Sequence, residues 1–182
     1  MNTLEKINLI QKKRETTTEE ALTIFDELAV ADLDFMIGQW QGFGIHTNHP
    51  MDGLLELFDW YGKEFISPEQ VHPLLFLDQD DQVIAIKPDP ALMKLAARWN
   101  FPKAKIFKLL FRLGFPLLTT QRYKARLRMM EYRQKVSATM IYDQLPIQDT
   151  FRKVDEDTVF GVMDFKTVPQ PFFFMLKRVE SA

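Results

Sequence analysis

A tryptophan set among alternating glycines constrains this chain more than any other feature. The stretch from Gly38 to Gly44 reads Gly-Gln-Trp-Gln-Gly-Phe-Gly and follows a helical pattern. In a strand from about residue 38 to about residue 47, the two-residue period places Trp40, Gly42, Gly44 and His46 on one face. Glycine has no side chain, so we expect the two inner glycines to leave room beside Trp40 and to let the strand bend sharply. The stretch therefore predicts the first strand of a closed β-barrel.

The last third of the chain reads as consecutive strands. From Thr120 onward, apolar residues alternate with polar ones almost to the end. The inner faces of these predicted strands lie in Tyr123–Met129, Val136–Tyr142, Ile147–Phe151, Val159–Phe165 and Phe172–Arg178. With the first strand and the short β-rich runs Val71–Leu77 and Gln82–Lys87, the chain has about eight strands, and an antiparallel sheet of that size commonly closes. The predicted fold is mainly β, an antiparallel barrel of about eight strands.

Helical patterns interrupt the strands in three places. A capping box at Thr17–Glu20 predicts an N-terminal helix over about residues 18–29. After the first strand, Pro50 and the apolar spacing that follows it predict a lid helix over 51–61, across a barrel mouth. A helical insertion contains a short basic amphipathic helix over 103–113. We expect a single barrel domain over 1–182, with an N-terminal helical region (1–36), a first β part (37–87), the insertion (88–118) and a C-terminal β part (119–182).

Composition excludes several classes of protein. The 182 residues include no cysteine, so the chain has neither disulfides nor a thiolate metal site. No apolar run resembles a signal peptide or a membrane span, which predicts a cytoplasmic location. Between Asp89 and Glu131 every charged residue is Lys or Arg. Such a block requires an anionic partner, a neighbouring acidic surface of the same protein, or water.

The glycine–tryptophan stretch resembles the bacterial GXWXG family. It continues into His49–Glu56 and Trp60–Lys63, as in that family. The second, uncharacterised domain that accompanies the motif would comprise Ala138–Asp143, Phe151–Asp155 and Gly161–Asp164. The resemblance implies no known activity.

A second resemblance, to the lipocalin-like or calycin barrels, rests on both ends of the predicted sheet. Those barrels open with Gly-x-Trp and close with an arginine, here Trp40 and Arg178. The resemblance implies that Arg178 packs over the Trp40 ring at the closed end. Fatty-acid-binding relatives carry a helical lid, whereas nitrobindin-like relatives bind haem through a late histidine. No histidine follows His72 here, so His46 is the only plausible substitute for the axial ligand and we expect no haem. We expect no other cofactor either.

Six residues form the candidate ligand site, and none of them is assigned a catalytic role. Trp40 forms the floor with Gly42 and Gly44 beside it, while His46, Tyr142 and Asp149 supply polar contacts. An inward Asp149 needs a partner or a raised pKa, unless a bulge turns it outward. His46 alternatively lies at an exposed strand end. We expect no metal, because the three histidines lack ligand spacing.

These residues predict binding of a small, largely apolar molecule inside the barrel. One alternative is an enzyme in which His46 and Asp149 form an acid–base pair, which requires a contact of about 3.2 Å or a bridging group. Another is an interaction module with weak contact to anionic membranes through the basic helix over 103–113. Nucleic acid is not an expected partner, because burial explains the phenylalanines of that helix better than base stacking. The oligomeric state stays open.

Overall fold

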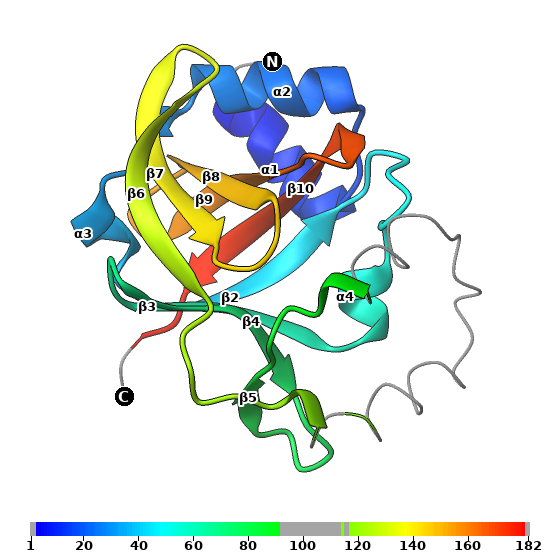
Figure 1. Cartoon of the computed structure of the whole chain (residues 1–182). Helices are drawn as coiled ribbons and strands as arrows, with labels where there is room; N and C mark the ends of the chain where they lie inside the picture. The colour runs from blue at the N-terminus through cyan, green and yellow to red at the C-terminus, as the bar shows by residue number, and fades with distance from the viewer. Residues whose placement is uncertain (1–2, 92–113, 115–116, 181–182) are drawn as a thin grey trace.

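The computed structural model describes residues 3–91, 114 and 117–180, and in this part of the chain a closed antiparallel barrel is the central element (Figure 1). The barrel strands are β2 (Gly38–Ile45), β3 (Trp60–Ser67), β4 (Gln70–Leu77), β6 (Ala125–Tyr132), β7 (Lys135–Tyr142), β8 (Ile147–Lys153), β9 (Thr158–Phe165) and β10 (Val168–Arg178). Their order around the barrel is β8-β7-β6-β4-β3-β2-β10-β9, and pairing of β9 with β8 closes the ring. Two short strands lie outside the ring, where β1 (Ala29–Val30) pairs with β8 and β5 (Val83–Ala85) pairs with β4. The predicted mainly β, calycin-like barrel is confirmed.

Two N-terminal helices form a second hydrophobic core on the outside of the barrel. Helices α1 (Thr3–Lys13) and α2 (Thr18–Glu27) pack across β2, β9 and β10 at the top of Figure 1. As predicted, the Thr17 side chain caps α2 by accepting a hydrogen bond from the Glu20 amide at 3.1 Å. The core shared by these helices and strands is formed by Ile7, Ile10, Ala21, Ile24, Phe25, Leu28, Ile45, Phe160, Val162, Phe173 and Met175. These strands are therefore apolar on both faces.

Trp40 and Arg178 close one end of the barrel beside α3 (Leu33–Met36). Trp40 is fully buried, and its indole Nε1 donates a hydrogen bond to the Met36 carbonyl at 2.8 Å. The Arg178 guanidinium carbon lies 4.2 Å from the centre of the Trp40 ring. Arg178 also donates to the carbonyls of Ile37 and Phe35 at 2.8 and 2.7 Å. The expected stacking of Arg178 on Trp40 is confirmed.

We expect Arg178→Lys to lower the free energy of unfolding by about 1.5–3 kcal/mol, the typical contribution of a hydrogen bond to a charged group. Lysine keeps the charge but loses the planar surface over Trp40 and the two-pronged donation to Ile37 and Phe35. Denaturant unfolding measures the loss, with Lys177→Arg as the control at an exposed neighbour. Equal stability of Arg178→Lys and the parent protein would contradict this account.

The lid helix over 51–61 is wrong in its extent. Helix α4 spans only Leu54–Leu57, and the residues before it form turns. Gly53 has φ of 79° and makes no side-chain cap. The Asp52 carboxylate instead accepts hydrogen bonds from the amides of Thr47 and His49, at 2.9 and 2.8 Å. These local hydrogen bonds satisfy backbone amides of the segment in a turn conformation, so the helix begins only after the turn.

One further expectation, about the inner face of β6 and β7, is wrong, and another concerns residues outside the described part of the chain. Met129 and Val136, placed on the inner face by their alternation, are exposed by 41% and 51%. Both lie near the β6–β7 turn, where the hairpin continues past the barrel interior. The basic helix over 103–113 and most of the insertion over 88–118 lie outside the described residues.

Candidate functional site

A buried ion pair lies among the aromatic side chains inside the barrel. The Lys63 ammonium on β3 lies 2.8 Å from the Asp149 carboxylate Oδ2 on β8, and the two side chains are 3% and 1% exposed. Lys63 Nζ also donates to the Pro73 carbonyl at 3.1 Å. Asp149 thus has the inward orientation expected from its position between Ile147 and Phe151, and the bulge that could have exposed it is absent from the β8 pairing.

Tyr142 completes the polar cluster. Its hydroxyl lies 3.5 Å from Lys63 Nζ, and the rings of Phe174, Trp60 and Tyr142 have their centres 5.1, 5.6 and 5.7 Å from that nitrogen. Burial, and then the nearby Asp149 carboxylate, raise the pKa of Tyr142 well above its ordinary value of 10.0, so the phenol stays protonated. Burial also raises the pKa of Asp149, while Lys63 opposes that shift.

Two buried polar atoms in this cluster have no hydrogen-bond partner among the described residues. They are Asp149 Oδ1, an acceptor, and Trp60 Nε1, a donor. Such atoms normally find partners, because an unsatisfied buried group costs about 1–3 kcal/mol. A hydroxyl group can donate to the first and accept from the second. The cluster therefore has unused hydrogen-bonding capacity of both kinds, inside an apolar barrel.

Lys63 was not among the residues expected at the site, and Gly62 is the sequence signal that could have revealed it. The β3–β4 pairing shifts register on both sides of Gly62, so Trp60 and Lys63 both point inward despite their odd spacing. Gly62 has φ of 152°, and a Cβ there would lie 1.9 Å from the Trp40 carbonyl oxygen. Only glycine fits so close to the neighbouring backbone. A glycine between two aromatic residues and a lysine in a strand thus indicates a bulge.

The two inner glycines of β2 make room for residues other than Trp40. A Cβ at Gly42 would lie 2.4 Å from the Trp60 ring, so this glycine gives space to Trp60 beside Lys63. A Cβ at Gly44 would meet Glu56 Oε1 at 3.1 Å, and the Gly44 amide donates to that oxygen at 3.2 Å. The expectation that these glycines leave room beside Trp40 is therefore wrong. Gly42 contributes to the polar cluster by making room for Trp60.

His46 lies at the end of β2 and away from the polar cluster. Its imidazole Nε2 is 3.8 Å from Glu56 Oε2, and its side chain is 39% exposed. Its backbone amide donates to the Arg14 carbonyl at 2.9 Å. Within the described residues, no hydrogen bond or ion pair joins His46 to Asp149, whose carboxylate pairs with Lys63. The acid–base pair thus loses the contact on which it depended.

His49 is buried and fixes the turn after β2. Its Nδ1 accepts a hydrogen bond from the Met51 amide at 3.1 Å, so the proton of the neutral ring is on Nε2. Nε2 then donates to the Gln170 carbonyl at 3.2 Å. Burial lowers the pKa of His49 below its ordinary value of 6.5, with Asp52 and the Gln170 carbonyl opposing the shift.

Because the folded pKa of His49 is lowered, its contribution to stability is present above pH 6.5 and is lost as pH falls through the folded pKa. We expect the parent protein to lose more stability than His49→Asn between about pH 8 and about pH 5. Asparagine retains an acceptor for the Met51 amide and does not titrate. Denaturant unfolding at each pH measures the difference, and parallel curves for the two proteins would contradict it.

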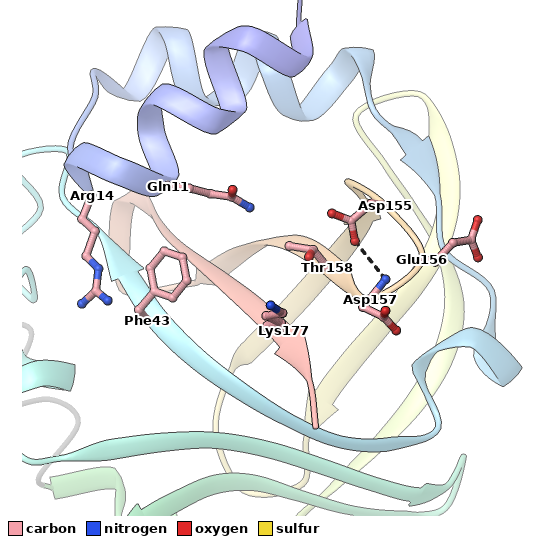
Figure 2. Close-up of a pocket in the computed structure, with 8 residues that line it drawn as sticks. All are labelled: Gln11, Arg14, Phe43, Asp155, Glu156, Asp157, Thr158 and Lys177. Atoms are coloured by element: carbon pink, nitrogen blue, oxygen red, sulfur yellow. Dashed lines mark hydrogen bonds between the residues drawn. The ribbon is translucent and has the colours of Figure 1, made fainter. Parts of the chain in front are cut away.

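A groove on the outer surface lies between α1, β2, β10 and the β8–β9 turn (Figure 2). Its volume is about 620 Å³. The lining residues are Gln11, Arg14, Phe43, Asp155, Glu156, Asp157, Thr158 and Lys177. The Arg14 guanidinium carbon lies 4.7 Å from the centre of the Phe43 ring, and the Asp155 carboxylate accepts a hydrogen bond from the Asp157 amide at 2.9 Å. None of the residues expected to bind a ligand lines this groove.

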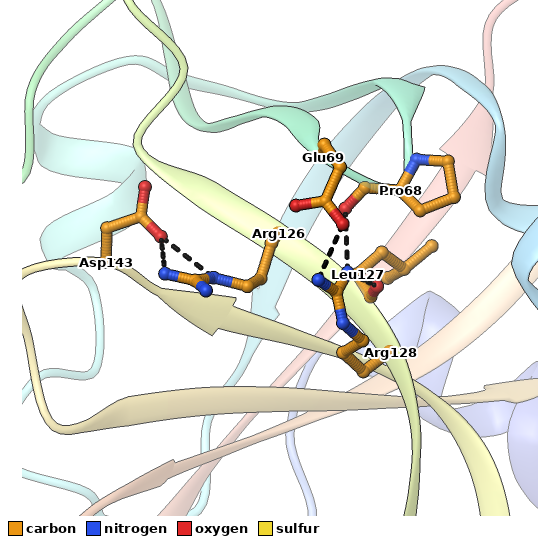
Figure 3. A network of polar contacts seen from close by, with 6 residues as sticks. All are labelled: Pro68, Glu69, Arg126, Leu127, Arg128 and Asp143. Atoms are coloured by element: carbon orange, nitrogen blue, oxygen red, sulfur yellow. Dashed lines mark hydrogen bonds and ion pairs between the residues drawn. The ribbon is translucent and has the colours of Figure 1, made fainter.

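Part of the basic block is neutralised by acidic residues of the same chain (Figure 3). Arg126 donates to the Asp143 carboxylate through Nε and Nη2, at 3.1 and 2.8 Å. Arg128 pairs with Glu69 at 2.6 Å. For these two arginines, the partner of the basic block is therefore a neighbouring acidic surface of the same protein. Among the described residues, no helix has the length and apolar character to cross a membrane, and no three metal-binding side chains are grouped together.

Comparisons with known proteins agree with the two segments of the barrel. Residues 23–81 match the family model described as GXWXG protein, and residues 123–178 match a domain of unknown function, DUF4334. A crystal structure of a protein from Thermomonospora curvata is 29% identical, with a TM-score of 0.74, and the match covers 99% of this chain and 100% of that one. A search of curated proteins found no match. This chain is thus similar to GXWXG proteins in one segment and to the domain of unknown function in the other, and both segments contribute strands to one closed barrel.

Proposed function

We propose that this protein binds a small, largely apolar molecule inside its barrel, with the polar end of that molecule at Lys63, Tyr142 and Asp149. One observation carries the proposal: Asp149 Oδ1 and Trp60 Nε1 are buried beside this cluster without partners in the part of the chain that the structure describes. A ligand hydroxyl that reached both atoms would satisfy a donor and an acceptor at once. The gain would come from hydrogen-bonding groups that burial otherwise leaves unsatisfied.

The surroundings of the cluster favour an apolar body for the ligand. The interior is lined by aromatic rings, together with the methionines Met36, Met140 and Met163. Methionine is flexible and polarizable, so it adapts to ligands of different shape. Few polar groups point inward beside these residues, which is typical of small-molecule sites.

The charge of the cluster favours a neutral polar end. The Lys63 ammonium and the Asp149 carboxylate already balance each other at 2.8 Å. A ligand carboxylate would add an unpaired negative charge in a region of low dielectric constant, which is costly. We therefore expect a medium-chain primary alcohol to bind more tightly than the fatty acid or the alkane of equal length.

Native mass spectrometry of protein purified from cells tests whether a small molecule is retained. Titration of tryptophan fluorescence with decan-1-ol, decanoic acid and decane then tests the order of affinity, because Trp60 lies in the cluster. The matched variants are Lys63→Met with Asp149→Leu, which removes the pair together, and Lys177→Met at an exposed position. Decanol binding that is lost only in the double variant supports the proposal. No retained mass and no decanol binding, or binding unchanged in the double variant, would overturn it.

The other two functions receive less support. The acid–base enzyme required His46 beside Asp149, and each of these side chains pairs with a different residue. The membrane-surface module depends on the helix over 103–113, which lies outside the described residues. Neither alternative accounts for the unpartnered atoms of the cluster.

A further inference from the structure

Lys63 brings a primary amine into the interior of the barrel. Among the described residues, Lys63 is the only buried lysine. Three aromatic rings surround its nitrogen, and its position is fixed by the bulge at Gly62. A buried ion pair is a poor source of stability compared with apolar residues of similar volume. A chemical role therefore explains a buried amine at this position better than a contribution to stability does.

The groups beside the amine are those that carbonyl chemistry needs. Asp149 Oδ2 lies 2.8 Å from Lys63 Nζ and can take a proton from it, while the Tyr142 hydroxyl at 3.5 Å is a donor for a carbonyl oxygen. Apolar surroundings penalise two separated charges, so they reduce the cost of moving the proton from the ammonium to the carboxylate. Burial raises the pKa of Asp149 in the same direction. Transfer of that proton, as the first step of a reaction, gives a nucleophilic amine next to a carboxylic acid.

We propose that Lys63 forms a reversible imine with the aldehyde or ketone group of an apolar compound held in the barrel. This inference rests on the proposed function, because the compound must first bind inside. The Lys63 nitrogen lone pair forms a bond to the carbonyl carbon as the C=O π bond breaks. The carbonyl oxygen, which accepts a hydrogen bond from Tyr142, takes a proton from the Asp149 carboxylic acid to become a hydroxyl, and the added nitrogen returns one proton to the Asp149 carboxylate. Asp149 then protonates that hydroxyl, which leaves as water when the C–O bond breaks and the C=N bond forms. The iminium nitrogen loses its proton to the Asp149 carboxylate, so amine and carbonyl compound give imine and one water, and Asp149 ends as the carboxylic acid.

Reductive trapping tests this inference. The full chain is incubated with decanal and cyanoborohydride, which delivers hydride to the imine carbon and leaves a stable secondary amine. Intact mass then reports the mass of decanal plus two hydrogens less one water, and peptide mapping locates the label. We expect Lys63 to carry the label at about ten times the level of exposed Lys177, because the bound aldehyde is held near the amine. The same protein unfolded in denaturant should lose this preference.

Two variants separate chemistry from folding. Lys63→Arg keeps a cation beside Asp149 but has no primary amine, and Lys177→Arg makes the same change at an exposed position. Lys63→Met with Asp149→Leu is a second variant that removes both charges if the arginine does not fit. Loss of the preferred label in the Lys63 variants, with retention in Lys177→Arg, supports the inference.

Binding of decan-1-ol distinguishes the two proposals, because an alcohol cannot form an imine. Decanol binding without preferential trapping at Lys63 would overturn the imine and leave the binding function in place. Label spread evenly over exposed lysines would also overturn it. If neither decanol binding nor trapping occurs, both proposals fail.

Discussion

Asp149→Ala should lower the free energy of unfolding by about 3–5 kcal/mol, the usual cost of removing one member of a buried ion pair. The Lys63 ammonium would remain 3% exposed without its carboxylate partner 2.8 Å away. Its remaining hydrogen bonds are to the Pro73 carbonyl and the Tyr142 hydroxyl, neither of which carries a compensating charge. Urea unfolding at neutral pH, followed by circular dichroism, measures the loss.

The double variant Lys63→Met with Asp149→Leu is the control for this prediction. Replacing both members by apolar residues removes the buried charge instead of isolating it, so its stability should be within about 1 kcal/mol of the parent protein or above it. With the single variants Lys63→Met and Asp149→Leu, the double variant also completes a cycle that gives the coupling between the two positions. If Asp149→Ala and the double variant lose equal stability, the cost comes from lost packing and the ion pair is not its source.

Those parts of the fold that depend on local periodicity could be predicted from the sequence. Strand alternation fixes which side chains face inward, and a closed barrel follows because the strands otherwise leave unpaired edges. The N-terminal cap at Thr17 involves residues within one turn of helix, so its pattern is visible along the chain. The stacking of Arg178 on Trp40 followed from a resemblance that joins the two ends of the sheet.

The polar cluster could be predicted only in part. Tyr142 and Asp149 lie on regular strands, so their inward orientation follows from parity. Lys63 lies beside a bulge, and a shift of one residue exchanges the faces of a strand. Parity also failed for His46, because β2 ends at Ile45 and the residue after a strand no longer alternates.

The turn after β2 is held by contacts that the local sequence pattern does not contain. The spacing of Met51, Leu54 and Phe58 suits an amphipathic helix, but tertiary and local hydrogen bonds decide the outcome. His49 binds the distant Gln170 carbonyl, and Asp52 holds the amides before it. A contact with a residue so far along the chain leaves no trace in the local pattern.

Trp40→Ala should lower the free energy of unfolding by about 3–5 kcal/mol, as is typical when a buried tryptophan is truncated. The ring is fully buried at the closed end of the barrel and packs against Phe35, with ring centres 5.8 Å apart. Its loss would leave a cavity beneath Arg178 and remove the hydrogen bond to the Met36 carbonyl. Denaturant unfolding measures the change.

Trp40→Phe is the matched control, because it keeps an aromatic surface beneath Arg178 while losing the indole N–H and part of the volume. We expect it to lose less stability than Trp40→Ala. Combining Trp40→Ala with Arg178→Lys should cost less than the two single changes added together, since the side chains are in contact at 4.2 Å. A loss below about 1 kcal/mol for Trp40→Ala, the range of ordinary surface changes, would mean that the ring does not hold this end of the barrel closed.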